Sequence, residues 1–287
     1  LLALIALAAG MYFDGLRLQR LVKIGGYKLS IKAVLRVIFS NYFMAMLTPG
    51  ASGGAVAQVL VLRSYGVPIS KGTPIVLIRT VFSIMFLVIM LPLVFLRDAI
   101  EIPYISRDML LIFAVLAVIA TLLGTYILQT KYMRQFVYNL AQRFKAHKTR
   151  DWLSKLETLN QGLGLLYKQP IQSFIVFIES GLSLLCLYCI APALMYAFTP
   201  DIPIIDILDR MILLNLILYF APTPGGTGIA EGLFVVLFSA FVPNGTVGIV
   251  AVAWRVVAEY LPFFIGMYAV LTLYGRQFVA QETSREQ

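Results

Sequence analysis

The chain has 287 residues, of which 60% are hydrophobic and 13% are charged, and its mean hydropathy is +0.87. Soluble domains usually carry about 25% charged residues, so this composition excludes an ordinary soluble protein and indicates a polytopic membrane protein. The net charge of +9 does not indicate a nucleic-acid partner, because the basic residues fall between apolar segments rather than on one soluble face. We expect a single membrane domain over residues 1–287.

Long apolar segments predict the membrane-spanning helices. A helix needs about 20 apolar residues to cross the hydrocarbon core. The segments that reach or approach this length are 1–16, 74–96, 109–129, 171–198 and 247–274. The first begins without methionine and already inside an apolar run, so we expect a further segment upstream of it.

Two other apolar regions are interrupted by a repeated proline-glycine motif. The copies are Thr48-Pro49-Gly50-Ala51-Ser52-Gly53-Gly54 and Thr223-Pro224-Gly225-Gly226-Thr227-Gly228. Proline lacks an N–H and glycine favours open backbone, so each copy breaks a helix and leaves polar groups that hydrocarbon cannot satisfy. The arms are 31–47 and 55–62 around the first copy, and 204–221 and 229–242 around the second. Because the arms after the glycines are short, we expect re-entrant hairpins.

The order helix, broken hairpin, helix occurs twice, over 1–96 and over 171–275. Lys and Arg concentrate on one side of the predicted topology, with 19 there against 3 on the other. Cytoplasmic loops are enriched in Lys and Arg, so the first hairpin is expected to enter from the cytoplasm and the second from outside. The sequence therefore predicts two inverted repeats in the plasma membrane, with the basic loops cytoplasmic.

A helix over 107–129 and a basic segment over 131–168 are expected to join the repeats. In the basic segment, apolar residues alternate with Lys and Arg. This pattern is typical of an amphipathic helix on the anionic cytoplasmic leaflet, and it is equally compatible with a basic cytoplasmic loop.

The similarity between the repeats extends beyond the motif. An asparagine precedes the motif threonine by 7 or 8 residues, and an arginine follows it by 31 or 32. These residues are Asn41 and Arg79 in the first repeat, and Asn215 and Arg255 in the second. Paired helix breaks in two halves of a membrane chain indicate a transporter binding site, because broken helices direct their ends at the cargo.

Ionisable residues at membrane depth are further candidates for function, namely Glu179, Glu231, Arg255 and Glu259. Helix starts carry unpaired N–H groups and partial positive charge, so the glycines before Glu231 could form an anion cradle. Glu231 could instead be an internal anion that caps its arm or pairs with Arg255. Arg255 and Glu259 are spaced i, i+4 and could simply pair along one helix. Glu179 is interpreted as a hydrogen-bonded core acid rather than a proton-coupling group.

The sequence offers little basis for enzyme chemistry. Its one histidine, His147, and its two cysteines, Cys186 and Cys189, give no metal cluster or catalytic triad. We therefore expect no catalytic residues, no metal and no cofactor. The residues expected to bind substrate are Thr48, Pro49, Gly50, Gly53, Gly54, Gln58, Arg79, Thr223, Pro224, Gly225, Gly226, Gly228, Glu231, Arg255 and Glu259.

Three sequence features resemble the lysylphosphatidylglycerol synthase/flippase transmembrane family. They are the first motif with Gln58, the second motif with Pro222 before it and Glu231 after it, and Trp254-Arg255 followed by Glu259-Tyr260-Leu261-Pro262. The resemblance covers nearly the whole chain. It implies a flippase-like domain that moves a polar-headed lipid between leaflets, with inverted re-entrant helices around a cavity.

The chain also departs from the family pattern. Many members carry a charged residue just after the first glycine cluster, where this chain has Ala55 and Gln58. Nothing after Tyr274 is long enough to form the aminoacyl-transferase domain of the fused members, so synthesis of an aminoacyl lipid is not expected.

The combined prediction is an all-α lipid translocator whose partners are membrane lipids with phospho- or aminoacyl-phospholipid headgroups. The glycine N–H groups of the second motif, Arg255 and Arg79 are expected to hold the phosphate. A lipid-synthesising enzyme or a second copy of the chain are further candidate partners. The alternatives are a secondary transporter of a small anion or ion, and a non-transporting partner of a lipid-modifying enzyme, for which a filled core is expected.

Overall fold

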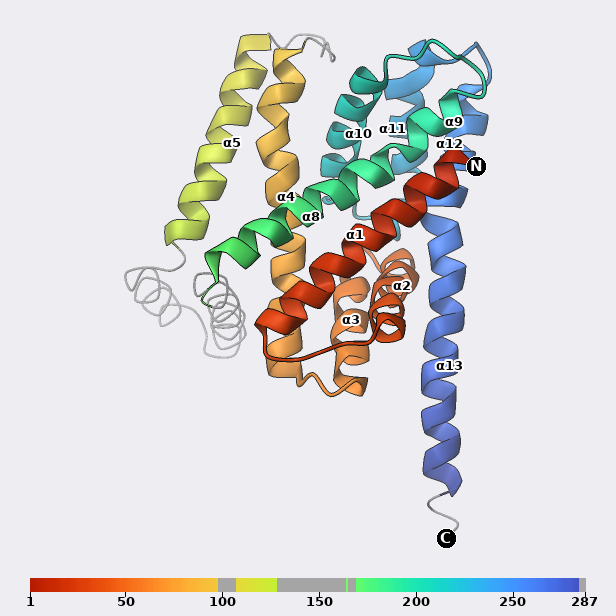
Figure 1. Cartoon of the computed structure of the whole chain (residues 1–287). Helices are drawn as coiled ribbons and strands as arrows, with labels where there is room; N and C mark the ends of the chain where they lie inside the picture. The colour runs from red at the N-terminus through yellow and green to blue at the C-terminus, as the bar shows by residue number, and fades with distance from the viewer. Residues whose placement is uncertain (98–106, 128–163, 165–168, 284–287) are drawn as a thin grey trace, which may run out of the picture.

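The computed structural model describes residues 1–97, 107–127, 164 and 169–283 (Figure 1). These residues form helices and no strand beyond a single β-bridge, which confirms the all-α prediction. The helices are α1 (Leu2–Ile24), α2 (Ile31–Leu47), α3 (Ser52–Ser64), α4 (Ile69–Leu96), α5 (Arg107–Ile127), α8 (Pro170–Tyr188), α9 (Ile190–Met195), α10 (Ile204–Leu218), α11 (Ile229–Phe238), α12 (Val247–Arg255) and α13 (Leu261–Thr283). The amphipathic helix predicted over 131–168 lies outside the described residues, apart from residue 164.

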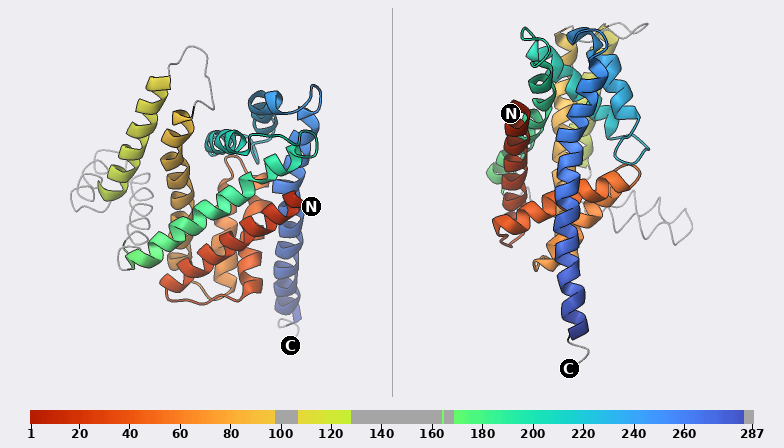
Figure 2. Two further views of the ribbon diagram at one scale, coloured as in Figure 1. Left: turned by 45° about the horizontal axis from the view of Figure 1, so that its top comes forward. Right: turned by 90° about the vertical axis from the view of Figure 1, so that its right-hand side faces the viewer.

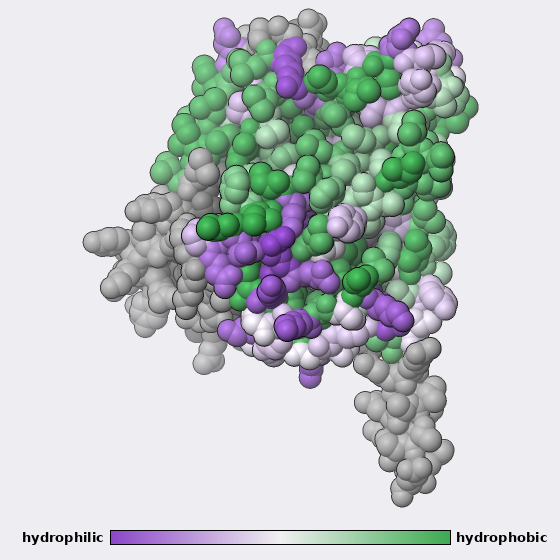
Figure 3. All heavy atoms as spheres, viewed as in Figure 1, coloured by the Kyte–Doolittle hydropathy of each residue, from purple (hydrophilic) through white to green (hydrophobic). Residues whose placement is uncertain are grey.

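Several helices have the length and composition needed to cross a membrane. Among the described residues, these helical stretches are Leu2–Ile24, Ile69–Leu96, Pro170–Met195 and Val247–Leu273. Figure 3 shows a broad hydrophobic band across one face of the molecule, with hydrophilic residues gathered above and below it. Large apolar side chains on the surface, such as Phe113, Ile171 and Val236, are more than half exposed. The chain is therefore a multi-pass membrane protein.

The two predicted hairpins lie in opposite halves of the molecule. In Figure 1 the α2–α3 hairpin is in the lower half and the α10–α11 hairpin is in the upper half. Helices α1 and α8 lie side by side and run in opposite directions (Figures 1 and 2). The last long helix of each half packs on the hairpin of the other half, α4 on α10 and α13 on α2. Inverted repeats would produce such matched contacts, and the orientation of the repeats in the membrane stays a prediction.

The tips of the two hairpins meet. Pro49 and Pro224 form an antiparallel β-bridge between them. Gly225 has a φ of +58° and lies so near α2 that an added Cβ would be 3.3 Å from the Cα of Met46. The tips of the broken helices thus cover each other within the protein, as a membrane environment requires.

The first helix is longer than predicted. We expected it to end at residue 16, but α1 continues to Ile24. Leu18, Leu21 and Val22 are buried and extend its apolar face beyond that point. Arg17 and Arg20, which lie beyond the predicted end of this span, therefore lie within the helix.

The last predicted span, 247–274, contains a change of helix type. Helix α12 is joined to α13 by a π-helical turn, Val256–Tyr260, and α13 continues to Thr283. Pro262 in the first turn of α13 has no N–H to donate, so a regular α-helical ladder cannot run through this point. The wider turn accommodates the missing hydrogen bond.

Gly266 tests the contact between α13 and α2. A Cβ at this position would lie 2.1 Å from the Phe39 carbonyl oxygen, which is backbone and cannot rotate aside. We expect Gly266→Ala to separate the two helices, destabilise the protein by about 1–3 kcal/mol and lower its melting temperature in detergent. Gly232→Ala in α11 is the matched control, because nothing lies within 4 Å of its added Cβ. Equal melting temperatures for the two variants would contradict this packing.

Candidate functional site

A cavity of about 480 Å³ lies between the hairpin tips. Both tips form its wall, with Gly50, Ala51 and Ser52 on one side and Thr223 and Gly225 on the other. The sequence-predicted site residues that line the cavity are Gly50, Gln58, Arg79, Thr223, Gly225, Gly226 and Glu259. The structure therefore brings residues of both motifs to one space.

The remaining predicted site residues do not line the cavity: Thr48, Pro49, Gly53, Gly54, Pro224, Gly228, Glu231 and Arg255. Gly53 and Gly54 let α3 approach α2, since an added Cβ would lie 2.6 Å from the Thr48 side chain or 2.4 Å from Asn41 Oδ1. Thr48 joins the two arms, because its Oγ1 donates to the Met44 carbonyl and accepts from the Gly53 N–H, both at 2.8 Å. These contacts stabilise the first hairpin.

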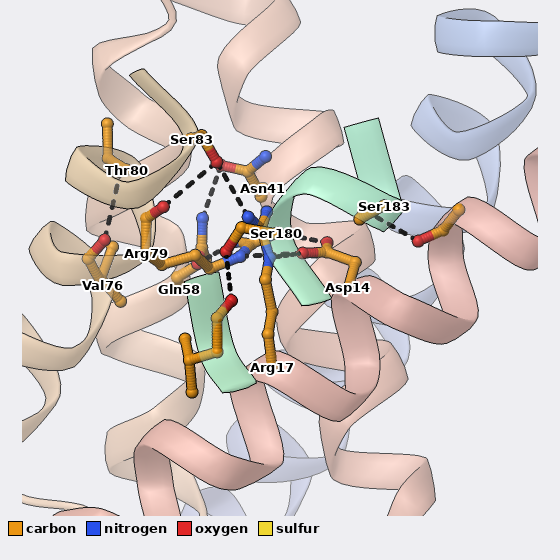
Figure 4. A network of polar contacts seen from close by, with 12 residues as sticks. Asp14, Arg17, Asn41, Gln58, Val76, Arg79, Thr80, Ser83, Ser180 and Ser183 are labelled. Atoms are coloured by element: carbon orange, nitrogen blue, oxygen red, sulfur yellow. Dashed lines mark hydrogen bonds and ion pairs between the residues drawn. The ribbon is translucent and has the colours of Figure 1, made fainter. Parts of the chain in front are cut away.

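Asp14 of α1 is shared by two arginines, and we call Asp14, Arg17 and Arg79 the Asp14 cluster (Figure 4). Its Oδ1 accepts from Arg17 Nε at 2.5 Å and from Arg79 Nε at 3.0 Å, while Oδ2 pairs with Arg79 Nη2. All three side chains are buried, and both arginines line the cavity. Because one carboxylate faces two guanidinium groups, the cluster has a surplus of one positive charge.

Other polar side chains hold this cluster in place. Arg79 Nη1 donates to Gln58 Oε1 at 2.5 Å, and Gln58 Nε2 donates to Asn41 Oδ1 at 2.6 Å. Arg17 Nη1 donates to Ser83 Oγ at 2.8 Å. Every N–H-bearing nitrogen of Arg79 is thus engaged, whereas Arg17 Nη2 has no hydrogen-bond partner among the described residues. Arg17 is the arginine with a free donor at the cavity wall.

Arg255 lies between two glutamates, and we call Glu231, Arg255 and Glu259 the Arg255 cluster. Its Nε donates to Glu231 Oε1 at 2.8 Å, Nη1 pairs with Glu259 Oε2, and Nη2 donates to the Gly225 carbonyl at 2.9 Å. The Arg255 side chain is only 1% exposed, and Glu259 is the member of the cluster that lines the cavity. With two carboxylates and one guanidinium, this cluster has a surplus of one negative charge.

Glu231 also caps the start of α11. Its Oε2 accepts the Gly228 N–H at 2.7 Å, while the Gly226 N–H donates to the Thr223 carbonyl at 3.0 Å. Two of the N–H groups expected to form an anion cradle are therefore already paired. Glu231 acts as the internal anion that sequence reasoning left as an alternative, and an external phosphate would have to displace its carboxylate.

Two hydroxyl groups of the cavity wall lack partners. Thr223 Oγ1 and Tyr188 Oη are buried atoms with no hydrogen-bond partner among the described residues. Buried polar groups in native proteins are nearly always hydrogen-bonded, so such atoms call for a bound molecule or water. The cavity thus presents a surplus of positive charge, a surplus of negative charge and two free hydroxyls.

Comparison with known proteins agrees with this architecture. The model of the family described as lysylphosphatidylglycerol synthase TM region matches residues 1–266. The chain belongs to the lysylphosphatidylglycerol synthase transmembrane-region family. It is also 21% identical over 263 residues to the UPF0104 membrane protein of Archaeoglobus fulgidus, an alignment that spans 89% of this chain and 80% of that protein. The lysylphosphatidylglycerol synthase TM match includes every member of the Asp14 and Arg255 clusters.

The sequence analysis missed Asp14 and Arg17, because Asp14 lies near the end of the predicted span 1–16 and Arg17 lies just beyond it. The available signal was the helical spacing of Leu18, Leu21 and Val22, which continues the apolar face of α1 past them. Glu179 pairs with Arg20 at 2.7 Å and does not line the cavity, in agreement with its interpretation as a core acid. In the parts of the chain that the structure describes, no three His, Cys, Asp or Glu side chains form a metal-binding group.

Asp14 provides a test of the first cluster. Asp14→Asn leaves two buried guanidinium groups without their carboxylate, so we expect a loss of about 3–5 kcal/mol and a clear fall in melting temperature in detergent. Asp201→Asn, on an exposed loop, is the matched control and is expected to have little effect. Arg17→Gln should also be mild, because Asp14 and Arg79 remain as a neutral pair. A melting temperature for Asp14→Asn as high as that of Asp201→Asn would show that the cluster does not contribute to stability.

Proposed function

We propose that this protein translocates a polar-headed phospholipid between the leaflets of the plasma membrane, as a transporter rather than an enzyme. The observation that carries the proposal is the cavity between the two hairpin tips, whose wall bears opposite charge surpluses in the interior of a membrane protein. Charged groups are costly there and usually mark a substrate pathway. In this proposal the headgroup occupies the cavity, the acyl chains stay in lipid, and the basic loops face the cytoplasm.

The charge distribution suggests how a headgroup lies in the cavity. Its phosphate faces Arg17 and Arg79, where a positive charge is uncompensated and Arg17 Nη2 is free to donate. A cationic group on the headgroup faces Glu259, and the hydroxyls of Thr223 and Tyr188 contact its polar atoms. Arg255 acts as a positioning residue in this arrangement, since it holds Glu259 and the Gly225 carbonyl rather than the phosphate.

Exposed apolar residues beside the cavity favour a lipid over a small soluble anion. Gly50, Ala51 and Ser52 line the cavity and are exposed, so it opens beside the first tip. Leu47 precedes this tip and Phe220 precedes the second, and they are 53% and 78% exposed. Apolar surface at the opening suits acyl chains, whereas a water-filled entrance would favour polar residues. The cavity also favours translocation over a non-transporting partner, for which a filled core is expected.

Lipid movement in proteoliposomes tests the proposal. Headgroup-labelled phosphatidylglycerol, lysylphosphatidylglycerol and polyprenyl phosphate would be compared for their exposure to a membrane-impermeant quencher over time. We expect the protein to accelerate movement of at least one phospholipid class. If folded protein moves none of the three, lipid translocation is not its function.

Arg17→Gln tests the assignment of the phosphate. It removes the positive surplus and leaves the neutral Asp14–Arg79 pair, so the protein should stay folded. A hydrogen bond to a charged group contributes about 1.5–3 kcal/mol, and we expect phospholipid movement to slow by about tenfold or more. Arg63→Gln, on the exposed end of α3, is the matched control. Equal rates for the two variants would place the phosphate elsewhere.

A further inference from the structure

The formal charges of the two clusters cancel in total, but each cluster alone carries a net charge. The Asp14 and Arg255 clusters together contain three guanidinium groups and three carboxylates, so their formal charges cancel. A zwitterionic headgroup that enters the cavity leaves this balance unchanged. An anionic headgroup adds one negative charge to a buried region, where an uncompensated charge is strongly unfavourable.

Uptake of one proton would restore the balance, and the contacts identify the group that takes it. Protonation of Asp14 would leave the two positive charges of Arg17 and Arg79 against the single negative charge of the headgroup phosphate. Both oxygens of Glu231 are occupied, one by Arg255 Nε and one by the Gly228 N–H. Glu259 differs from both, because only its Oε2 is paired and its Oε1 has no partner in the described part of the chain.

The surroundings of Glu259 allow it to lose its charge. The π-helical turn that carries it packs against α1, α12 and α13. Its charged neighbours are Arg255 of α12 and, through Arg255, Glu231 of α11. The cavity wall that Glu259 shares also includes Arg17 and Arg79 of the Asp14 cluster and the phenols of Tyr42, Tyr188 and Tyr219. If Glu259 is protonated, Glu231 and Arg255 remain as a neutral, hydrogen-bonded pair. No charge is then left unpaired on this side of the cavity.

The position of Glu259 in a π-helical turn supports a functional role. Such turns are rare and occur often at functional sites. Here the turn carries Glu259, which is the carboxylate of the Arg255 cluster that lines the cavity. Glu259 also lies close in sequence to Pro262, where the regular helical hydrogen bonding is interrupted. The carboxylate can therefore meet both the headgroup and the water that enters with it.

We propose that Glu259 couples lipid movement to protons, so that an anionic headgroup crosses with one proton and a zwitterionic headgroup crosses with none. The proton binds the Glu259 carboxylate from water on one side and leaves to water on the other, and no other bond forms or breaks. This inference rests on the proposed lipid translocation. It adds that the two kinds of headgroup differ in their response to a pH gradient.

A pH gradient across proteoliposomes tests the coupling. With the membrane potential held at zero by potassium and valinomycin, labelled phosphatidylglycerol would be allowed to reach its steady distribution between leaflets. One pH unit is a tenfold difference in proton activity, so one-to-one coupling shifts the leaflet ratio toward the alkaline side by about tenfold. Labelled phosphatidylcholine, whose quaternary amine cannot exchange a proton, should show no shift. Protein-free vesicles give the background.

The outcomes separate the inference from the proposed function. If phosphatidylglycerol moves but the gradient leaves its distribution unchanged, proton coupling is wrong and translocation stands. If neither lipid moves with folded protein, the proposed function itself fails. An equal shift for both lipids would also overturn the coupling, because it would not depend on headgroup charge.

Glu259→Gln tests the residue assigned. The variant imitates the protonated state and keeps the Glu231–Arg255 pair, so we expect phosphatidylglycerol movement that no longer responds to the gradient. Glu179→Gln is the matched control, since it removes a buried carboxylate that does not line the cavity and should keep the tenfold response. A full response in Glu259→Gln would overturn the assignment. If Glu259→Gln does not fold, the response of the unaltered protein alone decides whether coupling exists.

Discussion

Hydrocarbon offers no hydrogen-bond partners, so a helix that breaks inside a membrane must find them within the protein. This constraint explains why the two proline-glycine tips meet, with Pro49 bridged to Pro224. Each hairpin also supplies a hydrogen-bond acceptor for a backbone N–H at its own helix break. The Thr48 side chain does so in the first hairpin, and the Glu231 carboxylate does so in the second. The two tips also form part of the wall of the cavity, which polar side chains such as Gln58 and Arg79 line. The cavity is thus a product of the same contacts that make the fold possible.

One arginine contacts each hairpin, but the carboxylates around the two arginines differ. Arg79 binds Gln58 of the first hairpin and takes its carboxylate from α1, while Arg255 binds Glu231 of the second hairpin and takes a further carboxylate from its own helix. The first arrangement gathers an extra arginine and the second gathers an extra glutamate. The two sides of the cavity therefore carry opposite charge surpluses.

The features predicted correctly were those with a local cause. The first hairpin arm, 31–47, coincides with α2, because the proline-glycine break ends the helix within a few residues. The Asp14 cluster depends on contacts between α1 and α4, which no spacing along one helix reveals. Lys and Arg can be counted as loop residues only where the helix ends before the first cation. Helix α1 continues past Arg17 and Arg20, so the count placed them wrongly. The role of Gly53 and Gly54 as packing positions follows from neighbouring atoms rather than from residue type.

The π-helical turn between α12 and α13 constrains how many residues can separate Arg255 from Gly266. An α-helix turns about 100° per residue, so the extra residue in this turn rotates all of α13 relative to α12. Arg255 faces the second hairpin from one side of the turn, and Gly266 faces α2 from the other. A deletion of one residue in this turn would rotate α13 by about 100° relative to α12 and carry a side chain into the space next to Phe39 that only glycine fits. The number of residues between Arg255 and Gly266 is therefore fixed by the contacts at both ends of this segment.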